Sequence, residues 1–267
     1  MKNRIENKFK LLKSQNKKAF IAYITAGDPN LRVTEELVLA FEKSGVDIVE
    51  LGIPFSDPLA DGPTIQAASE RALKNHVTLK KIFDLVARIR RKSDIPLALM
   101  TYYNPIFHYG EDKFLKAAQA VGVDGIIIPD LPVEESRAFC VSVRKVHLAS
   151  VFFVAPTTTN NRLPRIARAS TGFIYYVSVT GVTGARKEVS THIKNHIRVV
   201  KKISDKPVCV GFGISNKEQI RQIGSMADGV IVGSAIIQQI QKNVGKKYLV
   251  KNVSTFVGGL VKSLKSN

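Results

Sequence analysis

The chain has 267 residues, 45% of them hydrophobic, and a formal net charge of +18 at pH 7. This composition supports one substantial hydrophobic core, and no linker-like tract divides the sequence, so we predict a single domain over residues 1–267. No apolar run is long enough to span a membrane, and the first residues lack the apolar segment of an export signal. We therefore predict a cytoplasmic protein.

The excess of lysine and arginine raises the question of a nucleic-acid or membrane partner. These residues occur in short pairs along the expected helix exteriors, and no aromatic stacking motif accompanies them. An anionic substrate or a basic host proteome explains the charge at least as well, so we predict neither a nucleic-acid nor a membrane partner. The two cysteines, Cys140 and Cys209, are far apart in sequence, as in proteins of a reducing cytosol.

Apolar periodicity predicts an N-terminal amphipathic helix followed by alternating strands and helices. The first helix covers residues 4–14, and eight strands are expected at residues 19–25, 48–53, 97–101, 124–128, 150–154, 173–177, 208–210 and 228–232. Further helices are expected at residues 31–44, 65–75, 79–92, 112–121, 134–146, 162–169, 193–203 and 249–264, with another that ends at residue 224. A long, mobile loop is expected at residues 178–190.

Eight such units predict an α/β fold of the (β/α)8 TIM barrel type, with one extra N-terminal helix. The competing fold is an open, doubly wound sheet, which rarely needs so many units. In a (β/α)8 barrel the loops that follow the strands form the active site. Residues near the carboxyl ends of the expected strands are therefore the candidates for function.

Residues 48–64 combine a strand that carries a glutamate with a loop stiffened by three prolines. Because side chains alternate in a strand, Glu50 lies among apolar neighbours, where a charge is costly. It is either a buried glutamate satisfied by a backbone donor or a lysine, or an acid/base group whose pKa is raised by desolvation. The stiff loop can hold Asp57 and Asp61 near it, and three carboxylates together favour acid/base chemistry.

Glycine-containing loops follow the last three expected strands. A phosphate commonly lies after the seventh and eighth strands of such barrels, where glycine lets backbone N–H groups approach its oxygens. Gly213, Gly233 and Ser234 are the candidates for this contact, although a glycine pair alone is usually only a tight turn. The five histidines are scattered and no lysine interrupts a strand core, so we predict neither a metal site nor a Schiff base.

Residues 50–66, with the sequence ELGIPFSDPLADGPTIQ, resemble the signature of the tryptophan synthase alpha subunit family. Residues 129–135, 181–185, 211–215 and 233–235 also resemble that family in order and spacing, and the resemblance covers about residues 5–262. It implies a lyase that cleaves indole-3-glycerol phosphate to indole and glyceraldehyde 3-phosphate by a retro-aldol reaction in L-tryptophan biosynthesis. The high basic charge and residues 186–192 depart from the family pattern.

The resemblance also implies roles for individual residues. Glu50 would protonate indole C3 and assist deprotonation of the glycerol hydroxyl, while Asp61 would accept the indole N–H and stabilise positive charge on the ring. Aromatic residues at strand ends, although commonly plain packing, are placed to surround that ring: Tyr23, Tyr102, Tyr176 and Phe212. Thr183 belongs to the loop that would close over the substrate. The phosphate contacts implied by the resemblance are Gly184, Gly213, Gly233 and Ser234.

The family works as an α2β2 complex with a beta subunit. The resemblance places the contact at residues 54–58, 104–105 and 132, and it implies no cofactor in this chain, because the beta subunit carries pyridoxal phosphate. Two other functions are possible from the sequence: a catalytically silent partner that only activates a beta subunit, and a basic nucleic-acid-binding module. The presence of both Glu50 and Asp61 argues against the silent partner.

Overall fold

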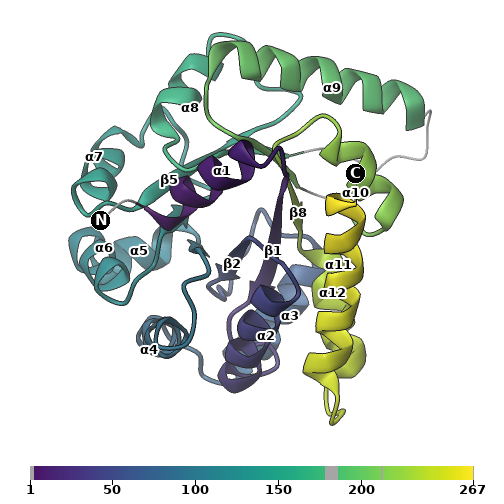
Figure 1. Cartoon of the computed structure of the whole chain (residues 1–267). Coiled ribbons are helices and arrows are strands. Elements are labelled where there is room, and N and C mark those ends of the chain that lie inside the picture. The colour runs from purple at the N-terminus through teal and green to yellow at the C-terminus, as the bar shows by residue number, and fades with distance from the viewer. Residues whose placement is uncertain (1–2, 178–185, 212, 267) are drawn as a thin grey trace.

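Eight parallel strands close into a barrel in the order β1 to β8 in this computed structural model (Figure 1). The structure describes residues 3–177, 186–211 and 213–266; for residues 186–192 it describes the backbone alone. The strands are β1 (Ala19–Thr25), β2 (Ile48–Gly52), β3 (Leu97–Met100), β4 (Gly125–Ile127), β5 (Ala149–Val154), β6 (Ile174–Val177), β7 (Val208–Gly211) and β8 (Gly229–Val232). The sequence-based prediction of a (β/α)8 barrel is confirmed.

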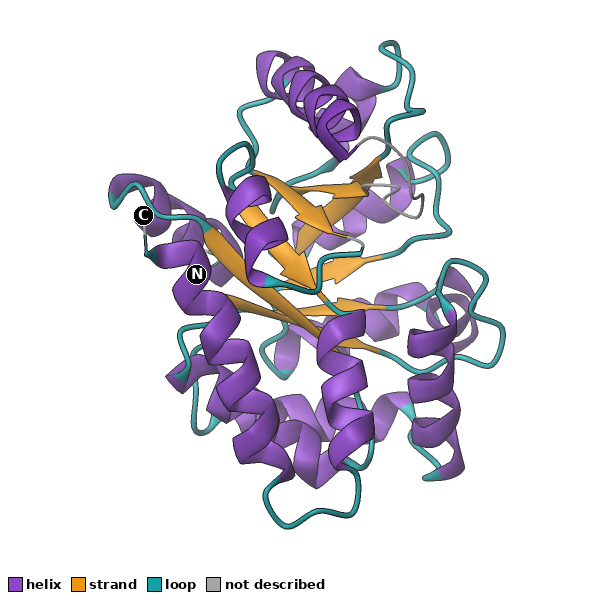
Figure 2. Cartoon of the chain, turned by 90° about the vertical axis from the view of Figure 1, so that its right-hand side faces the viewer, coloured by secondary structure: helices purple, strands orange, loops and turns teal. Residues whose placement is uncertain are grey.

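Helices surround the barrel and cover the outer face of its strands (Figure 2). They are α1 (Arg4–Ser14), α2 (Leu31–Lys43), α3 (Pro63–Lys74), α4 (Leu79–Arg90), α5 (Tyr103–Tyr109), α6 (Glu111–Ala120), α7 (Arg137–Lys145), α8 (Leu163–Ala169), α9 (Arg186–Ile203), α10 (Lys217–Gly224), α11 (Ser234–Asn243) and α12 (Leu249–Lys265). Because both faces of a parallel barrel strand are covered, all seven residues of β1 are buried.

Helix ends follow local sequence signals. The side chains of Asn30 and Thr78 accept backbone N–H groups in the first turns of α2 and α4, as capping residues do. Gly45 and Gly122 follow α2 and α6 with φ near 88°, a conformation that glycine adopts without strain. The short connections that result return the chain to the next strand of the barrel.

Helix α1 closes one end of the barrel, across which it lies in Figure 1. Ile5, Phe9 and Leu12 point from this helix into the cluster of side chains that fills the barrel interior. The Phe9 and Phe173 ring centroids are 5.8 Å apart, and a Cβ added to Gly125 would lie 2.8 Å from the Ile5 side chain. The α1 end is therefore packed, and a substrate can enter only from the opposite end, where the strands terminate.

Helix α11 follows Gly233 directly and occupies residues to which no element was assigned from the sequence. Two expectations about the elements were wrong. Residues 103–109 form α5 instead of a loop, since Pro105 lies in the first turn of the helix, where its missing N–H is not needed. Helix α9 begins at Arg186, which shortens the expected loop over residues 178–190. In the part of the chain that is described, no helix is long and apolar enough to cross a membrane.

Candidate active site

Glu50 projects from β2 into the barrel. It shares a strand face with Ile48, which belongs to the interior cluster, and its strand neighbours are Tyr23 on β1 and Ala98 on β3. Its side chain is fully buried, and neither carboxyl oxygen has a hydrogen-bond partner among the described residues. Desolvation raises the pKa of Glu50 to about 8, so the carboxyl is protonated at neutral pH. The alternative of a glutamate satisfied by a lysine or a backbone donor finds no support here.

Asp61 lies on the loop between β2 and α3, which hydrogen bonds hold in shape. The backbone N–H of Asp61 donates to the Pro58 carbonyl at 3.1 Å, and the Gln66 side chain donates to the Asp61 carbonyl at 2.8 Å. Partial burial raises the pKa of Asp61 to about 6, and the neighbouring Tyr102 hydroxyl opposes this shift. Asp61 is therefore mostly ionised at neutral pH, while Glu50 is mostly protonated.

Two tyrosines connect these carboxyl groups electrostatically. Tyr23 on β1 and Tyr175 on β6 are both buried, and burial raises the pKa of each well above its usual range. The negative charges of both Glu50 and Asp61 add to the shift at each tyrosine. The two acids therefore act on the same pair of hydroxyl groups.

The ring contact expected of Tyr176 is not supported, because its side chain faces away from the barrel interior. Its hydroxyl lies 3.0 Å from His196 Nδ1 on α9, and its ring packs with Ile193 and Ile197 of the same helix. The residue before it, Tyr175, points inward instead and packs on Phe153, with ring centroids 4.8 Å apart. Strand alternation could have separated the two tyrosines if the inward face of β6 had been assigned first.

The other aromatic candidates lie beside the acids. Tyr23 is a direct neighbour of Glu50 in the β1–β2 pairing, and Tyr102 contacts the loop that carries Asp61. The predicted contacts Phe212, Thr183 and Gly184 lie outside the described residues. Asp57, the other carboxylate of the loop, is exposed and accepts a hydrogen bond from the Ser56 hydroxyl.

Three expected phosphate contacts lie at the same barrel end as Glu50. Gly213 follows β7 with φ of 71°, and Gly233 follows β8 and directly precedes α11. The N–H groups of Ile236 and Ile237 donate to the Gly233 carbonyl, whereas the first two N–H groups of α11 have no acceptor within the helix. A helix start of this kind, with the exposed Ser234 at its first position, is suited to hold an anion.

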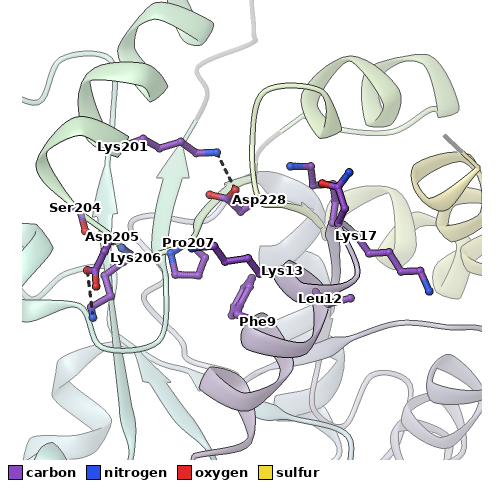
Figure 3. A pocket seen from close by; sticks show the side chains of 12 residues that line it. Phe9, Leu12, Lys13, Lys17, Lys201, Ser204, Asp205, Lys206, Pro207 and Asp228 are labelled. Carbon is purple, nitrogen blue, oxygen red and sulfur yellow. Dashed lines mark hydrogen bonds and ion pairs between the residues drawn. The ribbon is translucent and has the colours of Figure 1, made fainter.

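A separate cavity of about 300 Å³ lies beside α1, at the closed end of the barrel (Figure 3). Its two carboxylates are paired with lysines: Lys201 lies 2.8 Å from Asp228, and Lys206 lies 3.5 Å from Asp205. It therefore presents no free acid for catalysis. Among the side chains of residues 3–177, 193–211 and 213–266, no group of three or more histidine, cysteine, aspartate or glutamate residues could hold a metal ion.

A (β/α)8 barrel with a protonated buried glutamate, an aspartate that acts on the same tyrosines and a helix start suited to an anion is the arrangement of an enzyme that performs acid/base chemistry. The sequence model of the tryptophan synthase alpha chain family matches residues 9–265, and the chain belongs to this family. A family member from Thermoanaerobacter sp. (strain X514) is 47% identical over 258 residues, covering 97% of this chain and 98% of the relative. The relative from Geotalea daltonii is 49% identical over 257 residues, covering 96% and 97%.

Solved structures agree with the sequence comparison. The fold is similar to tryptophan synthase subunit alpha from Legionella pneumophila str. Paris, with a TM-score of 0.92, 37% identity and coverage of 99% of both chains. It is also similar to a chain of Mycobacterium tuberculosis tryptophan synthase, with a TM-score of 0.89, 34% identity and the same coverage. The resemblance predicted from residues 50–66 is thus confirmed over nearly the whole chain.

Proposed function

We propose that this chain cleaves indole-3-glycerol phosphate to indole and glyceraldehyde 3-phosphate by a retro-aldol reaction, with Glu50 and Asp61 as its acid/base pair. Membership of the tryptophan synthase alpha chain family supports the reaction. The observation that carries the assignment is the state of the Glu50 carboxyl. It is buried, has no hydrogen-bond partner among the described residues, and raises the pKa of the same two tyrosines as Asp61 does. Such a group is costly to keep in a core and is retained where it acts.

The reaction needs one proton to be delivered and one to be removed. Protonated Glu50 gives its proton to indole C3, and the ring nitrogen becomes positively charged while its N–H donates to the Asp61 carboxylate. The bond between C3 and the glycerol carbon then breaks, and its electrons return to the ring. The glycerol hydroxyl proton passes to the Glu50 carboxylate as the aldehyde forms, which restores the starting acid.

The remaining contacts of the proposal serve to bind and enclose the substrate. Tyr23, Tyr102 and Phe212 border the indole ring, and Thr183 belongs to the segment that closes over it. The phosphate is held by Gly184, Gly213, Gly233 and Ser234. The start of α11 at Ser234 supports the phosphate assignment, since its free N–H groups favour an anion.

We further propose a beta subunit as partner in an α2β2 complex, with pyridoxal phosphate bound by that subunit and not by this chain. The contact is assigned to residues 54–58, 104–105 and 132. Two large apolar side chains beside those segments support it: Leu59 is 93% exposed and Phe107 is 68% exposed. A cytoplasmic location fits the two buried cysteines, Cys140 and Cys209, which are not disulfide-bonded.

The test is indole release from indole-3-glycerol phosphate by the purified chain, alone and after mixing with a beta subunit. Glu50→Gln and Asp61→Asn keep the side-chain shapes and remove the acid/base groups, so both variants should lose activity while remaining folded. Equal turnover in the wild type and both variants would reject the assigned pair. A wild-type chain that releases no indole but stimulates the beta subunit would instead be a silent partner.

A further inference from the structure

The hydroxyl group of Tyr23 occupies a space that exists because residue 52 is glycine. A Cβ added to Gly52 would lie 2.1 Å from the Tyr23 hydroxyl oxygen, well inside van der Waals contact. Gly52 follows Glu50 by two residues and shares its inward strand face. The hydroxyl therefore lies over the strand that carries the acid, one step toward the open end of the barrel.

The other side of the Tyr23 ring packs against the proposed phosphate loop. A Cβ added to Gly233 would lie 3.3 to 3.5 Å from three atoms of Tyr23, namely Cδ1, Cβ and Cγ. The ring is thus held between β2 and the start of α11. Its position is fixed by close packing on both sides, which limits the movement of the hydroxyl.

The polar groups around the Tyr23 hydroxyl are buried and have few hydrogen-bond partners. Both oxygens of Glu50 are completely buried and make no hydrogen bond within the described part of the chain, and the buried Thr25 side chain is close enough to the Tyr23 hydroxyl to lower its pKa. A buried polar atom without a partner costs free energy, and in native structures such atoms commonly mark a functional site. Thr25 pairs with Gly52 across the two strands, so these groups and the Tyr23 hydroxyl gather in one place.

The charge of Glu50 acts on three titratable groups from different strands, namely Tyr23 on β1, Tyr175 on β6 and Cys209 on β7, while Asp61 and Tyr102 from the loops after β2 and β3 act on Tyr23. Asp61 is negative and cannot donate, and Cys209 is a weak donor. Tyr175 places its hydroxyl against Gly211 on β7, where an added Cβ would lie 2.6 Å away. Tyr23, by contrast, places its hydroxyl over the strand of Glu50 itself.

We propose that Tyr23 is a positioning residue for Glu50, whose hydroxyl donates a hydrogen bond to the carboxylate that forms when Glu50 gives up its proton. The inference rests on the proposed function. Tyr23 keeps its own proton throughout, since burial and the two nearby acids hold its pKa far above neutrality. A neutral donor of this kind stabilises a buried carboxylate without adding a second charge to the site. The proton transferred to indole C3 comes from Glu50 alone.

The test compares Tyr23→Phe with the wild type in the indole-release assay. This variant keeps the ring between Gly52 and Gly233 and removes only the donor. We expect kcat to fall about 10- to 100-fold, the effect of one hydrogen bond to a charged group, with KM changed less than about twofold. The pKa of Glu50 should rise, because the ionised form loses a donor, so activity should persist to higher pH than in the wild type.

Tyr109→Phe is the matched control. Tyr109 packs on Phe83 and Phe114 among the outer helices, and loss of its hydroxyl should leave kcat, KM and the pH profile unchanged. Thermal unfolding of both variants checks that they fold. A ¹³C NMR titration of the Glu50 carboxyl, measured without substrate, reports its pKa directly even where turnover is too slow to assay.

The inference is overturned if Tyr23→Phe has wild-type kcat and an unchanged pKa for Glu50. An increase in KM alone would also overturn it, since Tyr23 would then only pack against the substrate. Failure of the proposed function looks different: the wild-type chain would release no indole at all, or Glu50→Gln would remain active. With an active wild type and an inactive Glu50→Gln, the Tyr23 result decides the inference by itself.

Discussion

The hydroxyl oxygen of Tyr102 accepts a hydrogen bond from the backbone N–H of Ala60, with 2.9 Å between the two heavy atoms. Ala60 immediately precedes Asp61, so this bond ties the loop after β2 to the residue at the start of α5. The Tyr102 ring also packs on Phe55 in the same loop, with centroids 5.4 Å apart. The Tyr102 side chain therefore contacts both ends of residues 55–60, the segment that leads to Asp61.

Replacing Tyr102 with Phe removes this oxygen while keeping the ring in place. The Ala60 N–H loses its acceptor and Asp61 loses a neighbour that lowers its pKa, so the pKa of Asp61 should rise above its present value of about 6. We expect kcat for indole release to fall about tenfold, in line with a lost hydrogen bond of about 1–1.5 kcal/mol. Rates measured at pH 7 and pH 8 check this, since part of the loss should be recovered at the higher pH.

The two acids are assigned opposite protonation states, which gives a bell-shaped pH dependence. Asp61 must be ionised, so activity should fall as pH drops through about 6, and Glu50 must be protonated, so activity should fall as pH rises through about 8. The maximum is expected near neutrality. Steady-state kcat/KM, which reports the ionisations of the free enzyme, tests this when measured in one mixed buffer at constant ionic strength, and a kcat/KM that climbs steadily past pH 9 would contradict the assigned roles.

Asp61→Asn separates the two limbs of that profile. The amide cannot titrate, so the acidic limb should disappear while the alkaline limb remains near the pKa of Glu50. Single-turnover measurements give enough sensitivity for a slow variant. An acidic limb that persists in Asp61→Asn would assign it to another group.

Much of the fold was predictable because the strands are short, apolar and regularly spaced. Glu50 was also predictable, since a charged residue in an apolar strand must be neutralised, paired or used, and strand alternation gives its face once Ile48 is placed inside. The stiff loop indicated Asp57 and Asp61 together, and only the resemblance of residues 50–66 to the family signature separated them. These inferences depend only on local sequence, which is why they could be made before the structure was known.

The aromatic contacts could not be predicted as well. Tyr175 and Tyr176 are adjacent, so one must face the barrel interior and the other the helices, but the local sequence does not say which. Barrel closure decides it by pairing Tyr175 with Cys209 and turning Tyr176 toward α9. The contact between Gly52 and Tyr23 could not be predicted either, because the two residues are 29 positions apart in the chain.

Gly52→Ala should disrupt the site without changing a charge. The new methyl group would fall 2.1 Å from the Tyr23 hydroxyl and 2.6 Å from its ring carbon Cζ, so the tyrosine must move. We expect at least a 100-fold loss of kcat/KM, because small displacements in a preorganised site are costly, and a destabilisation of about 1–3 kcal/mol from overpacking. Indole-release kinetics and chemical denaturation measure the two effects.

Gly258→Ala is the control for that variant. Gly258 lies in α12, and the nearest atom to an added Cβ is the Ser44 Cβ at 3.6 Å, an ordinary contact. Activity should be unchanged and stability should rise by about 0.5–1 kcal/mol, since alanine favours a helix more than glycine does. If both alanine variants behave alike, the contact between Gly52 and Tyr23 does not matter for function.

The buried carboxyl of Glu50 should also cost stability in a pH-dependent way. Its pKa is raised from 4.5 to about 8 by burial, so between these values the folded chain holds a proton that the unfolded chain releases. Proton binding by Glu50 therefore adds to the free energy of unfolding. This contribution is fully present below pH 4.5 and is lost as pH rises through about 8. Glu50→Gln removes the titration, and the variant should therefore gain stability relative to the wild type as pH increases.

Urea denaturation of both proteins at pH 5 and pH 8.5 measures this gain. The difference in unfolding free energy between Glu50→Gln and the wild type should become more favourable to the variant by on the order of 3 kcal/mol over that interval. Any constant penalty for burying the amide cancels in the comparison. Glu36→Gln is the control, because it makes the same carboxyl-to-amide change in an exposed pair with Arg32. An equal response of the two variants would mean that Glu50 is ionised in the folded chain and cannot serve as the acid.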